Sequence, residues 1–232
     1  MVGNYFNKYS SDKKFKGYPH FDNSSFSDLA VFFSPIPRVK TCRIALTFPG
    51  SYKEVELQDC IIQQLLKRIM TGSPNSRLRK VLRYDTGLVY EVTMESVRYQ
   101  LFGYIDITTQ TDPQNLFRVV DAIIQSLLYL KAFGPTEEEY ESAKNHHINR
   151  VLIDDDRPDY VLGMMREALM NKGVVSTEDY IELVKSLDIN LVKPFIDKYW
   201  NFSKANLIVS GFVTDSVENR MILLNLLRKL SI

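Results

Sequence analysis

The stretch GSPNSRLRKVLRYDTGLVYEV, residues 72–92, carries the signals of a turn, a short helix and a strand in succession, and it determines the fold class of the chain. Its small and turn-forming first residues predict a turn, and Ser76 to Tyr84 predicts a short helix. Gly87 then interrupts the helical pattern, and a strand is expected to begin at Leu88. The stretch therefore predicts a helix that turns back into a sheet.

Two β-rich runs lie upstream of this stretch: LAVFF at residues 29–33 and TCRIALTF at residues 41–48. The segment SPIPR separates them, and its two prolines prevent a continuous strand or helix. We expect the two runs to form paired strands. Pro49-Gly50-Ser51 ends the second run, and apolar residues then recur at helical spacing from Val55 up to Gly72, which predicts a long amphipathic helix.

Downstream, MESVR is read as a turn, and residues 99–109 as the second strand of a hairpin. Asp112-Pro113 starts a helix that runs to Phe133 before Gly134-Pro135. Thr136 and Glu139 have the spacing of a capping box at the start of the next helix. The remaining expected elements are helices at 158–171, 177–187 and 190–199, a strand at 205–209, and a last helix at 216–230.

Strands grouped as hairpins and helices grouped in runs indicate an α+β fold with a mostly antiparallel sheet covered by helices. Residues 1–25 are polar and aromatic without a period, and are read as an N-terminal arm or linker. Residues 26–232 are expected to form a single domain. The arm is typical of an interdomain connector, which favours an excised half of a longer protein.

Composition excludes several classes of function. The formal net charge of the 232 residues is +1, so no overall field favours nucleic acid. No apolar run reaches the roughly 18–20 residues that a membrane span needs. The two cysteines, Cys42 and Cys60, have no CxxC spacing and are expected to be free buried thiols in a cytoplasmic protein.

Few residues of the sequence are candidates for catalysis by this chain alone. The glycines form neither a Walker loop nor a dinucleotide fingerprint, and no GxSxG motif is present. His146 and His147 follow a Glu-rich segment, which raises a metal-site hypothesis. Adjacent helical residues point about 100° apart, however, and cannot both face one metal as an i, i+4 pair can. We prefer a solvated helix face with one half-buried imidazole.

The first stretch resembles the second, non-zinc domain of the M16 metalloproteases, the family of pitrilysin, insulin-degrading enzyme and mitochondrial processing peptidase. The resemblance rests on Ser76-Arg77-Leu78, Leu82-Arg83 and Gly87-Leu88-Val89-Tyr90. It extends in order over most of the chain, through the blocks FPGSYKE (48–54), GPTEEEYESAK (134–144), TEDYIELVKSLD (177–188) and ANLIVSGFV (205–213).

This resemblance implies that Arg83 and Tyr90 are the Arg and Tyr pair with which the second half reaches the substrate. The family's active half carries an HxxEH zinc motif, and an ungapped count from Gly50-Ser51 puts the corresponding positions here near Gln63, Leu66 and Lys67. These side chains cannot form a zinc site with an activated water. No HxxEH occurs in the sequence, and zinc is expected in a partner half.

The resemblance thus implies a non-catalytic half of a zinc metallopeptidase that binds peptide substrate beside an HxxEH-bearing half, on the same polypeptide or a separate subunit. The isolated chain is expected to be inactive, with no cofactor, nucleic acid or membrane as a partner. Two alternatives remain: a structural or binding scaffold derived from such a peptidase, and an independent hydrolase that uses His146 or His147. For Arg83, the purely structural alternative is pairing with Asp85 or complementing the dipole at the C-terminus of its helix. For Tyr90, it is a place in the core.

Overall fold

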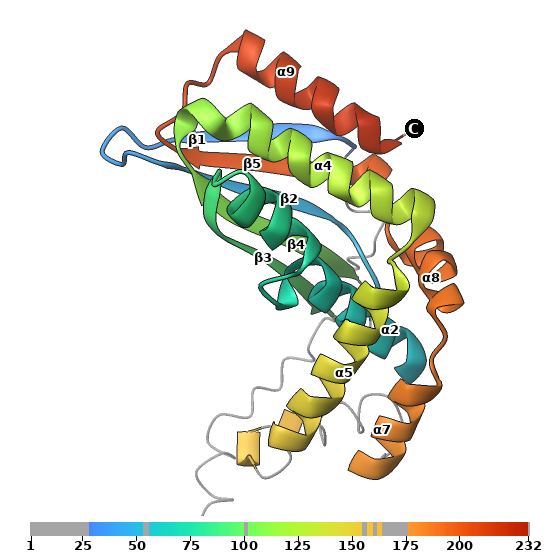
Figure 1. The fold of residues 1–232 in the computed structure, drawn as a ribbon. Helices are drawn as coiled ribbons and strands as arrows, with labels where there is room; N and C mark the ends of the chain where they lie inside the picture. Colours follow the sequence, from blue (N-terminus) through green and yellow to red (C-terminus); the bar gives the residue numbers. More distant parts are fainter. Residues whose placement is uncertain are drawn as a thin grey trace, which may run out of the picture.

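The computed structural model describes residues 28–52, 56–99, 102–154, 157–159, 162–163 and 176–231. Its centre is one five-stranded mixed sheet with the order β1-β5-β2-β4-β3 (Figure 1). The strands are β1 Ala30–Pro35, β2 Cys42–Pro49, β3 Val89–Arg98, β4 Gly103–Thr111 and β5 Asn206–Gly211. All neighbouring pairs are antiparallel except β1 and β5, so the predicted α+β class and mostly antiparallel sheet are confirmed.

The expected pairing of the first two strands is wrong, because β5 lies between them. β5 runs parallel to β1 and antiparallel to β2, with Cys42 opposite Gly211. Gly211 has a φ of 112°, and a Cβ there would meet the Thr41 carbonyl oxygen at 2.4 Å. Glycine therefore lets β5 pass close to the start of β2. The two prolines correctly predict a break in the chain between β1 and β2. They do not indicate that β5, from the far end of the chain, lies between these two strands.

The predicted hairpin exists, but its turn is displaced. Met94 to Arg98, the segment read as a turn, belongs to β3, and β4 begins only at Gly103. The polar residues of this segment suit a strand with one face in solvent, since Met94 is buried while Glu95 is exposed. The prediction of a turn at Met94 to Arg98 is therefore wrong, because the polar residues of this segment belong to an edge strand.

The helical segments of the described chain agree with the predicted ones in position. They are α2 Leu57–Lys67, η3 Arg68–Gly72, α3 Arg77–Arg79, η4 Lys80–Asp85, η5 Pro113–Asn115, α4 Leu116–Phe133, α5 Glu137–Asp154, α7 Thr177–Ser186, η6 Ile189–Leu191, α8 Val192–Tyr199, η7 Phe202–Lys204, α9 Val217–Arg228 and η8 Lys229–Ser231. The predicted helix at 158–171 falls mostly outside the described residues, as does the predicted arm at 1–25.

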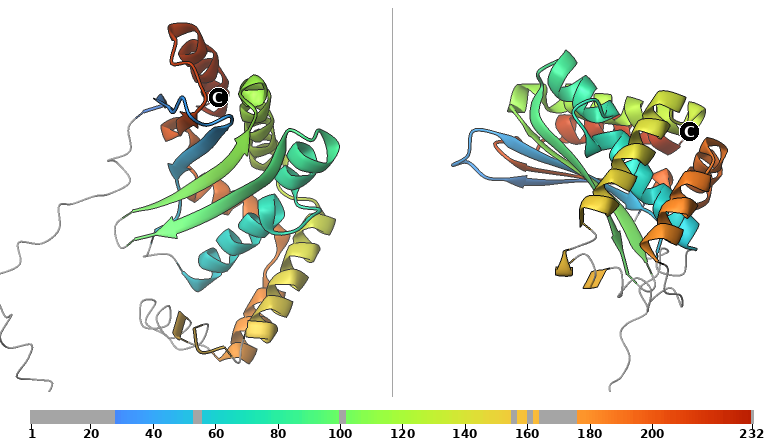
Figure 2. Two further views of the ribbon diagram at one scale, coloured as in Figure 1. Left: turned by 90° about the vertical axis from the view of Figure 1, so that its left-hand side faces the viewer. Right: turned by 60° about the horizontal axis from the view of Figure 1, so that its bottom comes forward.

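Helices gather on one face of the sheet (Figure 2), with α2 and α3 against β3, α4 against β2 and α9 against β1. Alternate residues of β2 point into this layer and are buried, and α4 meets them with an apolar stripe. The opposite face has no described helix over it (Figure 2), and it exposes Phe32 and Ile208 at 51% and 43%. None of the described helices is long and apolar enough to cross a membrane. The sheet thus has one covered and one open face.

Candidate functional site

Arg83 and Tyr90 lie together on the surface where η4 turns into β3. The Arg83 guanidinium carbon is 4.8 Å from the centroid of the Tyr90 ring and 5.4 Å from that of Tyr84. Tyr90 is 79% exposed. Within the described part of the chain, no hydrogen bond or ion pair engages the Arg83 guanidinium. The pair therefore presents a forked cation and a phenol hydroxyl to solvent.

Local sequence explains why these two side chains meet. Thr86 donates its hydroxyl hydrogen to the Val81 carbonyl at 2.7 Å, which satisfies one of the free carbonyls at the helix end. Gly87 then adopts a φ of 60° and donates its N–H to the Arg83 carbonyl. This left-handed turn reverses the chain, so the last helical turn and the first residues of β3 lie side by side.

Arg83 lies in the last turn of η4, where its charge can complement the helix dipole, as one structural alternative expects. Pairing with Asp85 and a place for Tyr90 in the core are not found in the described residues. No ion pair joins Arg83 to Asp85 among them, and Arg83 instead contacts two aromatic rings. Tyr90 does not fill the core, since most of its surface is in solvent. Tyr90 is a large exposed aromatic side chain whose hydroxyl has no hydrogen-bond partner in the part of the chain that the structure describes, a feature that core packing does not require.

Of the neighbouring basic residues, to which the sequence assigned no role, Arg77 and Arg79 make internal contacts. Arg77 is nine-tenths buried, donates to both carboxylate oxygens of Glu139 at 2.9 and 2.5 Å, and lies over the Tyr129 ring. Arg79 lies 3.5 Å from the Glu91 carboxylate. Lys80 is exposed. Arg77 therefore connects α3 to α5 inside the protein.

The positions that correspond to the zinc motif hold no ligand set. Gln63 is buried and accepts a hydrogen bond from the Trp200 indole at 3.0 Å, and Leu66 is fully buried. Lys67 pairs with Glu95 at 2.5 Å. An amide, an alkyl group and an ammonium do not fit a zinc ion, and the described residues contain no group of three His, Cys, Asp or Glu side chains that could hold a metal.

The two histidines of α5 have different surroundings. His146 is exposed, but His147 is buried, with Nδ1 accepting from Arg68 Nε at 3.1 Å and Nε2 3.0 Å from the Tyr180 hydroxyl. Burial and the nearby Arg68 lower the pKa of His147 to about 4. His147 is therefore neutral near pH 7, with both ring nitrogens engaged inside the protein. The sequence predicted a solvated helix face with one half-buried imidazole, whereas one imidazole is exposed and the other is buried. Among the described residues, neither histidine belongs to a group of three side chains that could hold a metal.

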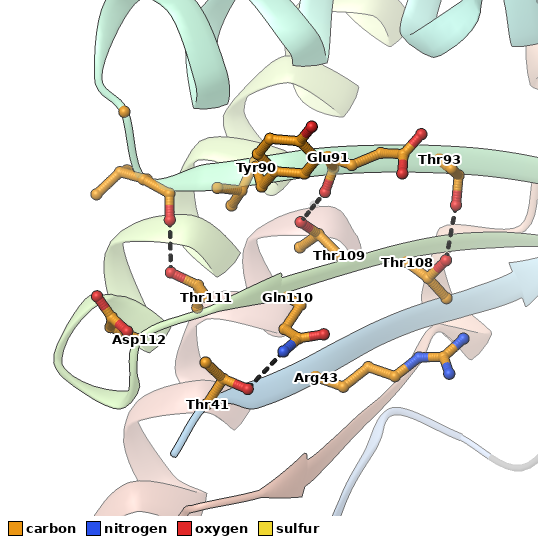
Figure 3. A pocket seen from close by; sticks show the side chains of 13 residues that line it. Thr41, Arg43, Tyr90, Glu91, Thr93, Thr108, Thr109, Gln110, Thr111 and Asp112 are labelled. Atoms are coloured by element: carbon orange, nitrogen blue, oxygen red, sulfur yellow. Dashed lines mark hydrogen bonds between the residues drawn. The ribbon is translucent and has the colours of Figure 1, made fainter. Parts of the chain in front are cut away.

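A shallow groove of about 750 Å³ adjoins the pair on the open face of the sheet (Figure 3). Tyr90 and Glu91 of β3 border it beside Gln110 of β4, and Arg43 of β2 lies on its other side. Its wall is rich in hydroxyl and amide groups, which suits hydrogen bonds to an extended chain. Cys42, buried beneath this end of the sheet, is a free thiol like Cys60, as predicted.

Sequence reasoning missed residues that shape this site. Thr109 and Thr111 donate hydrogen bonds to backbone carbonyls on either side of Tyr90, and Arg79 meets the neighbouring Glu91. The signal was present as the threonine-rich run TTQT at 108–111. It could not be used, because its partners lie 18 and 23 residues away in the chain.

Comparisons with known proteins agree with this architecture. Residues 1–146 match the family model described as the peptidase M16 inactive domain. The match covers more than half of the chain, which therefore belongs to this family. A search of curated protein sequences returned no match.

Several solved structures share the fold at low sequence identity. The peptidase M16 inactive domain from Pseudomonas fluorescens superposes with a TM-score of 0.71 at 19% identity, covering 79% of this chain and 44% of its own. A protease from Helicobacter pylori gives 0.71 at 14%, covering 86% and 48%. Complex III2 from Candida albicans with Inz-5 bound gives 0.69 at 10%, covering 85% and 49%. This chain spans about half the length of the solved chains it matches.

Proposed function

We propose that this chain is the non-catalytic half of an M16 zinc metallopeptidase, and that Arg83 and Tyr90 bind the peptide substrate for a half that carries HxxEH. The observation that supports the proposal is the exposed Arg83–Tyr90 pair, whose ring and guanidinium are 4.8 Å apart and whose polar groups are uncommitted within the described chain.

The chemistry of the pair suits this role. Peptide hydrolysis builds negative charge on the scissile carbonyl oxygen, and donors held where that charge develops lower the barrier. A guanidinium offers permanently charged, forked N–H groups, while a phenol offers one directional O–H. Both can donate to main-chain carbonyls whatever the side chains of the substrate. The adjoining groove of hydroxyl and amide groups extends the surface along which a peptide would lie.

The metal belongs to the partner half in this proposal. The corresponding positions of α2 are filled by Gln63, Leu66 and Lys67, which do not fit zinc. Zinc would supply Lewis acidity for the hydrolysis from the other half, which lies on the same polypeptide or on a separate subunit. Because this chain spans about half of its structural relatives, a two-half active site agrees with its extent. The cytoplasmic setting stays a prediction.

A scaffold is the second candidate, favoured by the similarity to a chain of complex III2 from Candida albicans. This candidate predicts a stable complex that is indifferent to the two side chains of the pair. The exposed position of Tyr90 favours the substrate-binding proposal, because a scaffold has no need to keep an Arg and a Tyr uncommitted at one site.

Peptide cleavage tests the proposal directly. The chain is assayed alone with added zinc, and then combined with the HxxEH-bearing half from the same source. The variants are Arg83→Ala and, as a control, Lys80→Ala, which removes one positive charge from an exposed position of the same helical segment. We expect turnover only in the combination, with a loss of about 10²-fold for Arg83→Ala and little change for Lys80→Ala.

The other outcomes are equally informative. Cleavage by the isolated chain would overturn the assignment as a non-catalytic half and revive the hypothesis based on His146 or His147. Cleavage by the combined halves that does not depend on Arg83 would leave the scaffold candidate. Circular dichroism of each variant shows whether a loss of turnover reflects a loss of folding.

A further inference from the structure

Strand β3 contains an irregularity at the point where it carries Tyr90. Val89 pairs with Thr111 and Val92 pairs with Thr109, so two residues of β3, Tyr90 and Glu91, face one residue of β4. This is the pattern of a β-bulge, in which one extra residue interrupts the ladder and changes the directions of the side chains around it.

The bulge decides which side chains reach the solvent. Val89 and Val92 are both buried, at 6% and 0%, whereas Tyr90 and Glu91 between them are both exposed. In a regular strand successive side chains alternate between the two faces. A regular β3 that kept Val89 inside would turn Glu91 into the core and Val92 into solvent. The bulge therefore allows Tyr90 and Glu91 to share the exposed side.

Two threonine hydroxyls hold the backbone on either side of the bulge (Figure 3). Thr111 donates its Oγ1 hydrogen to the Leu88 carbonyl, and Thr109 donates to the Glu91 carbonyl, each at 2.6 Å. Both side chains are about 5% exposed or less. The hydrogen bond to Leu88 is buried and the one to Glu91 is part-buried. Carbonyls withdrawn from water require a donor, and a bulge disrupts the backbone ladder locally. The hydroxyls thus satisfy the two carbonyls that flank the displaced residues.

Arginines of the preceding helical segment contact both residues of the bulge. Arg83 contacts the Tyr90 ring, and Arg79, four residues earlier, lies 3.5 Å from the Glu91 carboxylate. The two bulge residues therefore meet two arginines of one helical segment, α3 followed by η4. A shift of β3 by one residue would break both contacts, because each side chain would change its face.

We propose that Thr109 and Thr111 are positioning residues for Tyr90: their hydroxyls fix the bulge that holds the phenol beside Arg83 at the substrate groove. The role in turnover rests on the proposed function, whereas the role in holding the bulge stands on the geometry of this chain. Neither threonine touches the substrate in this proposal.

The experiment replaces both threonines by valine, which keeps the branched shape and removes the hydroxyl, and by serine, which keeps the hydroxyl. Thr108→Val is the matched control, because Thr108 hydrogen-bonds Thr93 at 2.8 Å between the same two strands, away from the bulge. Thermal unfolding verifies that each variant folds. Should the double valine variant fail to fold, the two single valine variants replace it.

Amide hydrogen exchange of this chain tests the geometry independently of any partner. We expect the amides of residues 90–92 to exchange at least about tenfold faster in Thr109→Val/Thr111→Val than in the wild type, because opening of the bulge becomes easier. The serine variant and Thr108→Val should keep the wild-type rates at these amides. Unchanged exchange in the double valine variant would overturn the proposal.

Turnover by the assembled halves tests the functional consequence. The double valine variant should lower kcat/KM roughly 10- to 100-fold, since small displacements of a binding group cost that much. In a Tyr90→Ala background the same replacement should change kcat/KM less than about twofold, because the group that it positions is gone. Equal losses in both backgrounds would show a purely structural role and overturn the proposal. If Tyr90→Ala alone leaves kcat/KM unchanged while the double valine variant still exchanges its amides faster, the proposed function fails and the role of the threonines in the bulge stands.

Discussion

The ring of Tyr90, on a strand, lies 4.8 Å from the guanidinium carbon of Arg83, on a helix, across a turn made possible by Gly87. An exposed cation–π contact of this kind is worth about 0.5–1 kcal/mol. The contact is strong enough to favour one arrangement of two long side chains, yet weak enough for a peptide carbonyl to displace it. The pair is thus partly ordered before a substrate arrives.

The Tyr90 hydroxyl should matter separately from its ring. Tyr90→Phe keeps the contact with Arg83 but removes the donor, so kcat of the assembled halves should fall by about 10²-fold while the thermal midpoint of this chain stays the same. Steady-state kinetics with a fluorogenic peptide measure the first effect and calorimetry the second. Full activity of Tyr90→Phe beside an inactive Tyr90→Ala would assign the role to the ring instead.

The Arg77–Glu139 pair should stabilise the fold. Burial alone would raise the pKa of the Glu139 carboxyl, but hydrogen bonds from Arg77 and Thr136 outweigh it and hold the pKa below its ordinary range. Glu139→Gln should reduce the free energy of unfolding at pH 7 by about 1.5–3 kcal/mol, as measured by urea unfolding. The exposed pair Lys185–Glu182, at 2.8 Å, is the control, and Glu182→Gln should cost less than about 1 kcal/mol. Equal effects of the two replacements would contradict this assignment.

His147 should make stability depend on pH. Its folded-state pKa of about 4 lies below the ordinary value near 6.5, so the unfolded chain binds more protons between these values. This contribution is complete above about pH 6.5 and is lost as the pH falls toward 4, by roughly 3 kcal/mol in total. Urea unfolding at several pH values measures it. His147→Gln should flatten the dependence within this window, whereas exposed His146→Gln should change it little; equal slopes for wild type and His147→Gln would contradict the prediction.

Replacing Gly211 should disturb the centre of the sheet. A Cβ at this position meets the Thr41 carbonyl oxygen at 2.4 Å, and the φ of 112° is strained for any residue with a side chain. Gly211→Ala should therefore lower the free energy of unfolding by about 1–3 kcal/mol. Gly163→Ala is the control, because a Cβ there meets nothing within 4 Å. A Gly211→Ala protein as stable as the wild type would show that β2 and β5 can separate at no cost.

Short-range signals were the parts of this fold that the sequence predicted well. Thr136 and Glu139 form the expected capping box, with N–H groups donating to side-chain oxygens at 2.9 and 3.2 Å. The helix that ends at Phe133 stops at Gly134, whose φ is 74°. Each signal depends on residues within one or two helical turns, where stereochemistry alone decides the conformation.

Long-range pairing was the part that local patterns could not predict. The position of β5 between β1 and β2 depends on residues about 160 to 180 positions apart, and the bulge depends on hydroxyl groups of a neighbouring strand. The internal role of Arg77 could not be predicted from local sequence, because its partner Glu139 follows 62 residues later. The Arg83–Tyr90 pair was identified through a family resemblance, and the structure adds that the two side chains meet.

The place of β5 also has a consequence for how the chain is made. β1 ends at Pro35 and finds its strand partner only at Asn206, after about 170 further residues. At a synthesis rate of 5–20 residues per second, the ribosome needs roughly 10–30 s to deliver that partner. During this interval β2 can pair with β4 while its other edge stays open and β1 has no neighbour in the described sheet. Completion of the sheet thus waits for the synthesis of β5, and until then the nascent chain depends on the β2–β4–β3 half of the sheet to keep its shape.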